Sequence, residues 1–338
     1  MSIDNPLDAF NGEVLDLLVP ASLAGMRLDR ALSMLTGLSR SETNAIVDEG
    51  TVSLDDHVTT KASLALRAGQ HLVAFLPPPD TGEVEADSGV EIDVVYEDES
   101  LIVINKAPGV VVHPGAGQRD RTLIAGVLAR YPEIANLVSQ GVCEPGRPGV
   151  VHRLDKGTSG LLVVARTVTA FRSLSEQLAD RSMERTYLGL VDGHVKEERG
   201  VVDAPIGRSS RNPTLMTVRS DGRVARTGYR VLDRIEKPHA VALLELKLET
   251  GRTHQIRIHL ATIGHPVVND TKYGHRRDRR LEPERFFLHS TTLSFIHPES
   301  GERVHTSAPL PTDLANLVTG LGTVQNRMAR ASIRFNDR

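Results

Sequence analysis

The stretch His152-Arg-Leu-Asp-Lys-Gly-Thr-Ser-Gly-Leu-Leu-Val-Val-Ala-Arg166 joins a charged, glycine-containing loop to an apolar strand. Arg153, Asp155 and Lys156 lie in the loop, and residues 161–165 predict a buried strand. A charged loop on a rigid strand is a common way to present a catalytic group. The same pattern also fits a surface turn in which Asp and Arg merely pair, so this segment alone leaves both interpretations open.

A second charged segment, Leu248 to Pro266, follows the clearest strand pattern in the chain. Leu and charged residues alternate over 241–250, which predicts a half-buried strand. Thr253 is expected to cap a helix, with Ile256, Leu260 and Ile263 as its apolar stripe, and Gly264 and Pro266 are expected to end it.

This helix start gathers polar side chains: Arg252, His254, Gln255 and Arg257. Free backbone N–H groups at a helix N-terminus favour anions such as phosphate or carboxylate. A metal site is not expected, because His254 and His259 are five residues apart rather than the four that place two ligands on one helical face.

Composition indicates a folded protein with more than one buried core. The chain has 338 residues, of which 40% are hydrophobic and 25% charged. No apolar run approaches the ~20 residues that a membrane helix needs. The acidic N-terminus lacks a secretory pattern, and a single cysteine, Cys143, excludes internal disulfides and a thiolate-built zinc site. These features favour a cytoplasmic protein without a membrane partner.

The net charge of −3 is the average of two unlike regions. Residues 1–100 hold 5 Lys and Arg against 19 Asp and Glu, whereas the remainder holds 35 against 24. Arginines are dense in 208–230 and 272–285, which suits contacts with phosphate groups. The larger, basic part therefore admits a polyanionic partner, although a charge run can also be no more than a solvated face.

The first 76 residues predict a small domain of two helices and short strands. Leu28, Leu32 and Leu35 have helical spacing, and Ser39 with Glu42 forms a capping box for a second helix that ends at Gly50. Short strands are expected at 51–54, 63–66 and 71–75, with a turn at Asp55-Asp56. This order resembles the S4 domain, an RNA-binding module, although residues 1–80 carry 5 basic against 11 acidic side chains.

Proline and acidic residues mark the predicted boundary between two domains. Residues 77–89 are expected to be a linker, because three prolines precede an acidic Gly/Ser segment. The predicted organisation is a flexible tail over 1–12, an S4-like domain over 13–76, the linker, a catalytic domain over 90–325 and a second tail over 326–338. Strands and helices mix without a strict β-α-β order in the larger domain, so we expect the α+β class.

Five segments of the larger domain together resemble the RluA/RluD type of RNA pseudouridine synthase. They are Asn105-Lys-Ala-Pro-Gly-Val-Val-Val-His-Pro114, His152 to Gly160, Arg185-Thr-Tyr187, Thr250 to Arg257 and Leu288-His-Ser290. The resemblance implies a mixed, largely antiparallel sheet flanked by helices and loops, and conversion of RNA uridines to pseudouridine. Two departures are visible: Ala107 separates Lys106 from Pro108, and Asn269 stands where the family usually has Gly.

The resemblance also implies roles for seven residues. Asp155 would be the catalytic carboxylate, Arg252 its ion-pair partner, and Tyr187 the residue that stacks on uracil. Arg153 would fill the gap left by the flipped nucleotide, and Lys106, His254 and Gln255 would support RNA binding or loop geometry.

The reaction is an isomerisation, so no cofactor is expected. The S4-like module favours large-subunit ribosomal RNA as the substrate, and we expect a monomer. The alternative is a non-catalytic RNA-binding or ribosome-assembly factor on the same fold. The joint presence of Asp155, Tyr187 and Arg252 disfavours it, because binding a polyanion needs no carboxylate.

Overall fold

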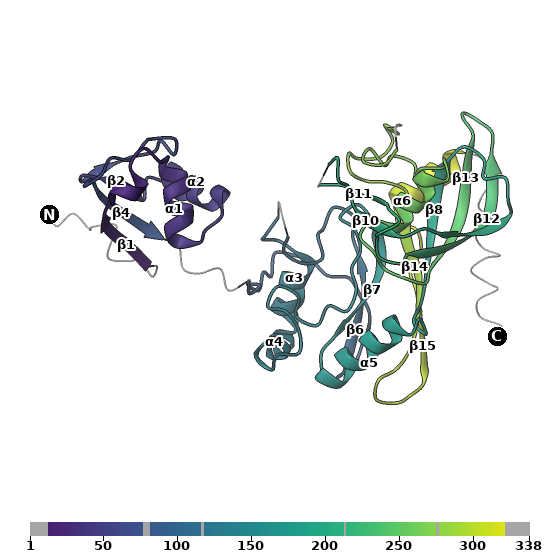
Figure 1. The fold of residues 1–338 in the computed structure, drawn as a ribbon. Helices are drawn as coiled ribbons and strands as arrows, with labels where there is room; N and C mark the ends of the chain where they lie inside the picture. The colour runs from purple at the N-terminus through teal and green to yellow at the C-terminus, as the bar shows by residue number, and fades with distance from the viewer. Residues whose placement is uncertain (1–12, 77–81, 116–117, 213, 275–276, 322–338) are drawn as a thin grey trace. The chain divides into compact units, whose positions relative to one another are not determined.

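The structure is a computed structural model that describes residues 13–76, 82–115, 118–212, 214–274 and 277–321. The tails predicted over 1–12 and 326–338, and the proline-rich start of the predicted linker, lie outside these residues. The chain divides into two compact units, Met1–Gly82 and Glu83–Arg338, and each is described by itself (Figure 1).

The first unit packs two helices on a four-stranded sheet of order β1-β4-β2-β3. Its elements are β1 (Glu13–Leu18), η1 (Ala21–Leu23), α1 (Leu28–Thr36), α2 (Arg40–Asp48), β2 (Val52–Leu54), β3 (His57–Val58) and β4 (His71–Leu76). Its core includes Leu28, Leu32, Val47 and Leu72, none of which is exposed.

The capping box is confirmed, since the Glu42 N–H donates to Ser39 Oγ and the Ser39 N–H donates to the Glu42 carboxylate. The prediction of a strand at 63–66 is wrong, because only a single bridge between Arg27 and Ala65 forms there. The edge strand β1, which pairs with β4, was not predicted.

The second unit is built on a nine-stranded sheet of order β5-β6-β7-β14-β8-β13-β12-β9, with β15 paired to β14. Its larger strands are β5 (Val94–Glu97), β6 (Leu101–Lys106), β7 (Ser159–Ala165), β8 (Glu184–Asp192), β9 (Arg199–Asp203), β12 (Arg226–Ile235), β13 (Val241–Leu248), β14 (Leu288–Ile296) and β15 (Arg303–Ser307). A two-stranded sheet joins β10 (Ile206–Arg208) to β11 (Met216–Val218). Among the described strands, β7 and β14 form the one parallel pair, and the α+β prediction is confirmed.

Helices and loops cover both faces of this sheet (Figure 1). The helices are α3 (Leu123–Arg130), η2 (Pro132–Ala135), α4 (Asn136–Ser139), α5 (Val168–Ala179), α6 (Gln255–Thr262) and α7 (Thr312–Gly320). Leu162 and Val164 of β7 pack in the core that contains α3, whereas Leu161 and Val163 pack in the core that contains α5. The strand that follows the loop 152–158 is therefore buried on both faces, as its apolar run predicts.

Two local predictions fail for the same reason, which is burial by other parts of the chain. The strand predicted over 241–250 is not half-buried: Glu245 is only 7% exposed, because it lies in a central strand and is ion-paired with Arg230. Residues 83–89 are not a free linker either. Val84 packs against the core, and the Asp87 N–H donates to the Ala125 carbonyl of α3 at 3.0 Å.

Candidate active site

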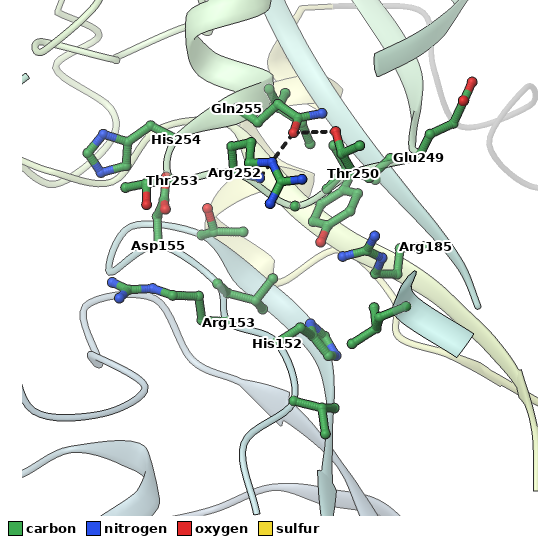
Figure 2. Close-up of a pocket in the computed structure, with 18 of the residues that line it drawn as sticks. His152, Arg153, Asp155, Arg185, Glu249, Thr250, Arg252, Thr253, His254 and Gln255 are labelled. Carbon is green, nitrogen blue, oxygen red and sulfur yellow. Dashed lines mark hydrogen bonds between the residues drawn. The ribbon is translucent and has the colours of Figure 1, made fainter. Parts of the chain in front are cut away.

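A cavity of about 640 Å³ opens beside the loop that precedes β7. Its wall is formed by that loop, α5, β8 and the segment 248–257, so residues far apart in sequence meet there (Figure 2). Six of the seven predicted site residues line it: Arg153, Asp155, Tyr187, Arg252, His254 and Gln255. The seventh, Lys106, is not among the lining residues.

Asp155 is held by an arginine, but not by the one that the sequence predicted. The Arg257 Nη1 donates to Asp155 Oδ2 at 3.0 Å. Arg252 instead donates from Nε to the Val224 carbonyl at 3.1 Å. The predicted ion pair between Asp155 and Arg252 is therefore wrong. The reason is where the helix starts. Because α6 begins at Gln255, Arg257 is its third residue and faces the loop that carries Asp155. Arg252 lies in the turn before the helix.

Arg257 is itself fixed from three sides. Its guanidinium makes two hydrogen bonds to Asp270, of 2.7 and 2.8 Å, and its Cζ lies 4.1 Å from the centre of the Phe286 ring. Burial lowers the pKa of Arg257, but the Asp270 hydrogen bonds and the charge of Asp155 outweigh burial and raise it. Arg257 thus remains a cation and orients Asp155, whose side chain is 17% exposed at the cavity wall.

The side-chain amide of Gln255 forms hydrogen bonds within the protein rather than with a ligand. Its Oε1 accepts from Thr250 Oγ1 at 2.7 Å and from the Arg252 N–H at 3.0 Å, the two bonds drawn in Figure 2. Its Nε2 donates to the Arg226 carbonyl and to Thr227 Oγ1. Both ends of the amide are used within the fold, so of the two roles expected for Gln255, RNA binding or loop geometry, the contacts fit loop geometry in the turn before α6.

His254 caps α6 in a strained conformation. Its φ is +56°, in the left-handed region, and no side chain caps the helix, so Thr253 is not the cap that the sequence predicted. Tyr273 Oη accepts from the Met216 N–H and lies 2.7 Å from His254 Nδ1. The Tyr273 proton is thereby available to Nδ1, which leaves Nε2 of a neutral imidazole as the donor. Burial lowers the pKa of His254, in accord with the neutral form.

Tyr187 lies on β8 with only 3% of its surface exposed. Burial raises the pKa of its hydroxyl, while the positive charge of Arg185, two residues earlier on the same strand, opposes that shift. Residues two apart on a strand project to the same face, so both side chains belong to the cavity wall.

Arg153 projects from the loop and is held by a histidine of another predicted motif. His113 Nδ1 lies 2.9 Å from the Pro114 carbonyl, to which it must donate. Its Nε2 can therefore accept from Arg153 Nη1 at 3.0 Å. Burial lowers the pKa of His113, which keeps the ring neutral and able to accept this bond.

Lys106 lies behind the loop that carries Asp155 and is 1% exposed. Its ammonium donates to the carbonyl oxygens of Ala107, Val110 and Lys156 at 2.8, 2.9 and 3.2 Å. Burial lowers the pKa of Lys106, and the charge of Asp155 opposes that shift. Of the two roles expected for Lys106, these contacts fit loop geometry rather than RNA binding. The bond to Lys156 ties the loop that carries Asp155 to the end of β6, and the other two hold the segment that follows β6.

The described residues contain no group of three or more His, Cys, Asp or Glu side chains placed to hold a metal ion. In the same part of the chain, no helix is long and apolar enough to cross a membrane.

Comparison with known proteins places this site in a family. Residues 100–262 match the family model described as RNA pseudouridylate synthase. The chain is 39% identical over 318 residues to the ribosomal large subunit pseudouridine synthase D of Nitrosomonas europaea, covering 92% of this chain and 89% of that protein. It is 43% identical over 315 residues to an uncharacterized RNA pseudouridine synthase of Chloroflexus aurantiacus, covering 93% and 96%.

A solved structure agrees with these relatives. The human RNA pseudouridylate synthase domain containing 1 aligns with a TM-score of 0.52 and 30% identity, over 71% of this chain and 98% of that one. The matched region contains the loop of Asp155, the strand of Tyr187 and the start of α6, which are the segments that the sequence singled out. The chain therefore belongs to the RluA/RluD type of RNA pseudouridine synthases, enzymes that isomerise uridine in RNA to pseudouridine.

Proposed function

We propose that this enzyme modifies uridines of large-subunit ribosomal RNA, with Asp155 as the catalytic carboxylate and the target nucleotide flipped out of its helix. The observation that carries the proposal is the carboxylate at the cavity wall, bonded through one oxygen to an arginine that Asp270 and Phe286 hold in place. Only Arg257 is hydrogen-bonded to the Asp155 side chain within the described residues, so Oδ1 is left to meet a substrate.

The reaction needs a single oriented carboxylate. The bond between ribose C1′ and uracil N1 breaks, and a bond between C1′ and C5 forms, while the proton lost from C5 is matched by one gained at N1. Asp155 could attack C1′, attack the uracil, or remove a ribose proton, as carboxylates do at related glycosidic bonds. Each route detaches and rotates the base within a closed pocket.

Two further residues act on the flipped nucleotide in this proposal. Tyr187 stacks on the uracil from the floor of the cavity, where its ring is buried. Arg153 occupies the place that the nucleotide leaves, because it projects from the same loop as Asp155 and the His113 contact that holds it is a single hydrogen bond.

The charge around the cavity suits an RNA backbone. Arg252 lies close enough to Arg223 for that positive charge, after burial, to lower the pKa of Arg252. Neither arginine has a carboxylate within 4.0 Å in the described part of the chain. By contrast, Arg219, Arg230, Arg280 and Arg285 of the two basic stretches are paired with carboxylates of this chain. The unpaired cations near the cavity are the better phosphate contacts.

The ribosomal substrate is inferred from the relatives, several of which are named ribosomal large subunit pseudouridine synthase D. The first unit would then contact the same RNA as an S4-like module. Such a substrate would place the enzyme in the cytoplasm, acting as a monomer.

The test is to map pseudouridines in total RNA from cells with the gene, without it, and with only an Asp155→Asn copy. Loss of specific large-subunit sites in the second and third strains is the expected result. Sites lost only from transfer RNA would contradict the ribosomal substrate. Full modification in the Asp155→Asn strain would instead favour the alternative of an RNA-binding or assembly factor.

A further inference from the structure

Two buried nitrogen atoms in the cavity wall have no hydrogen-bond partner: Arg185 Nε and His152 Nδ1. Arg185 is only 6% exposed. Buried donors are almost always satisfied, so two unpartnered donors on residues that line one cavity point to a ligand group that binds beside them.

Both atoms are donors. The Arg185 Nε carries a proton at any ordinary pH. His152 Nε2 accepts from the Val163 N–H at 3.2 Å, and a ring nitrogen that accepts carries no proton. Burial lowers the pKa of His152 to about 3, with the charge of Arg185 adding to the effect, so the ring is neutral and Nδ1 bears its one proton.

Arg185 differs from the buried Arg257 and Arg285 because nothing neutralises it. Within the described residues its side chain forms no ion pair and no hydrogen bond. Glu249, a carboxylate in the same cavity wall, is paired with Arg181 at 3.2 Å and with Arg226 at 3.4 Å. Figure 2 shows the Arg185 side chain extending away from the Glu249 carboxylate, on the side of the cavity where Arg252 lies.

The fold makes room for this guanidinium. A Cβ on Gly251 would lie 3.1 Å from Arg185 Nη1, while the backbone of Gly251 has no positive φ that would itself require glycine. A side chain at position 251 would therefore crowd the guanidinium, which would have to shift by a few tenths of an ångström. A cation that is buried without a counter-ion destabilises the protein, and such groups are kept where negative charge develops during a reaction.

We propose that Arg185 and His152 bind a carbonyl oxygen of the uracil and stabilise the negative charge that develops on the base when the glycosidic bond breaks. This rests on the proposed function. As the C1′–N1 bond breaks, its electron pair remains on the uracil and spreads from N1 to O2 and O4. The pair is used again when C5 bonds to C1′ and the C5 proton is replaced by one at N1. If Asp155 first attacks the base, the charge likewise falls on a carbonyl oxygen.

The base fits this position better than a phosphate does. Arg185 shares a face of β8 with Tyr187, and its charge is the strongest one acting on the Tyr187 hydroxyl, ahead of that of Asp155. A phosphodiester belongs to a chain that continues into solvent, whereas this guanidinium is almost wholly buried beside the residue proposed to stack on the uracil.

The test compares Arg185→Met with wild type in single-turnover reactions on a synthetic RNA hairpin carrying one of the mapped uridines. Arg234→Met is the matched control, since Arg234 lies in the same sheet on β12 but outside the cavity wall. We expect Arg185→Met to lower the rate at saturating RNA by about 10²-fold to 10³-fold, with RNA affinity within about threefold of wild type. The control should match wild type in both.

A weaker affinity with a reduced salt slope of binding, about 0.7 lower, and an unchanged rate at saturation would make Arg185 a phosphate contact and overturn the proposal. A wild-type rate in Arg185→Met would also overturn it. Failure of the wild-type enzyme on this RNA would instead refute the proposed function, so the two failures are distinguishable.

If Arg185→Met does not fold, the contact between Arg185 and the uracil can be tested with Arg185→Lys and thio-substituted RNAs. Hairpins with 2-thiouridine or 4-thiouridine replace one carbonyl oxygen by sulfur, a poor acceptor. At the contacted position the losses from Arg185→Lys and from sulfur should not multiply, because both remove one hydrogen bond. Losses that multiply at both positions would contradict the contact.

Discussion

The partner of Asp155 is decided by a small difference in where a helix starts. Arg252 and Arg257 occur in one polar run, and composition alone cannot distinguish them. The resemblance implied Arg252, but in the structure His254 takes the left-handed cap conformation and Arg257, the third residue of the helix, reaches Asp155.

Asn269 shows why a departure from the family pattern is harmless. Its φ is +65°, a conformation that suits glycine best and asparagine next. Its amide donates to the carbonyl oxygens of Glu282 and Arg285 at 3.0 and 2.6 Å. The substitution therefore keeps the turn that carries Asp270, the anchor of Arg257.

At the residue scale, Arg257→Met and Arg252→Met should behave differently. Arg257→Met leaves Asp270 buried without its cation, which should cost about 3–5 kcal/mol of unfolding free energy, and should lower the single-turnover rate by about 10²-fold or more. Arg252→Met keeps the ion pair and should mainly weaken RNA binding. Denaturant unfolding and single-turnover rates measure both. A larger loss of rate in Arg252→Met would restore the pairing that the sequence alone suggested.

At the scale of elements, the loop that carries Asp155 is held in place by Arg285. Its Nη1 donates to the Gly157 carbonyl at 2.7 Å, its Nη2 to Ser159 Oγ at 3.0 Å, and its Nε to Asp313 of α7 at 2.6 Å. Ser159 then donates to His289 Nδ1 on β14 at 2.9 Å. One arginine thus links the loop, α7 and two strands.

Arg285→Met should loosen that loop without touching the substrate. We expect a lower unfolding free energy, by about 3 kcal/mol, and a rate at saturating RNA that falls more than RNA affinity does. Arg280→Met is the control, because Arg280 is paired with Asp278 on the surface and is 44% exposed. Denaturant midpoints and single-turnover rates of the two variants provide the comparison. Equal effects of both substitutions would contradict the role of Arg285 in holding the loop.

Sequence patterns predicted elements well where the signal is local. The capping box of α2 and the buried strand β7 form where their residues indicate. The predictions failed where contacts with distant parts of the chain determine whether a residue is buried. Glu245 is buried because β12 supplies Arg230, and α6 is buried on all sides by the sheet and loops around it, so neither follows a simple amphipathic pattern.

The site shows the same limit. Asp155, Tyr187 and Arg153 came from motifs, and all three line the cavity. Asp270 lies 13 residues beyond Arg257, and its role depends on the turn at Asn269, for which the sequence gives no spacing rule. Arg185 and His152 were quoted within motifs but carried no signal of their own, because only the fold reveals which buried donors lack a partner.

At the scale of the whole molecule, the charge asymmetry follows the two units. The first unit has its own core and more acidic than basic side chains. Its buried Asp29 forms ion pairs with Arg27 at 2.9 Å and with Arg40 at 3.7 Å. The second unit carries the cavity and the unpaired cations beside it. An RNA contact by the first unit must therefore rely on few basic side chains.

Deleting residues 1–82 tests that contact. The second unit has separate cores and should remain folded, with the rate at saturating RNA near that of the full chain. If the first unit binds RNA, affinity for the ribosomal fragment should fall, and the salt slope should decrease by about 0.7 for each phosphate of single-stranded RNA that this unit neutralises. Binding titrations at several salt concentrations measure both quantities. Unchanged affinity and slope would assign the acidic unit another role.

The most direct test of the account is Asp155→Asn in the purified enzyme, assayed for pseudouridine in a single turnover and for RNA affinity in parallel. The amide keeps the shape of the side chain and can still accept from Arg257, so the cavity should persist. We predict no detectable pseudouridine, with RNA affinity within about threefold of wild type. Pseudouridine formation at the wild-type rate would contradict the assignment of Asp155 as the catalytic carboxylate.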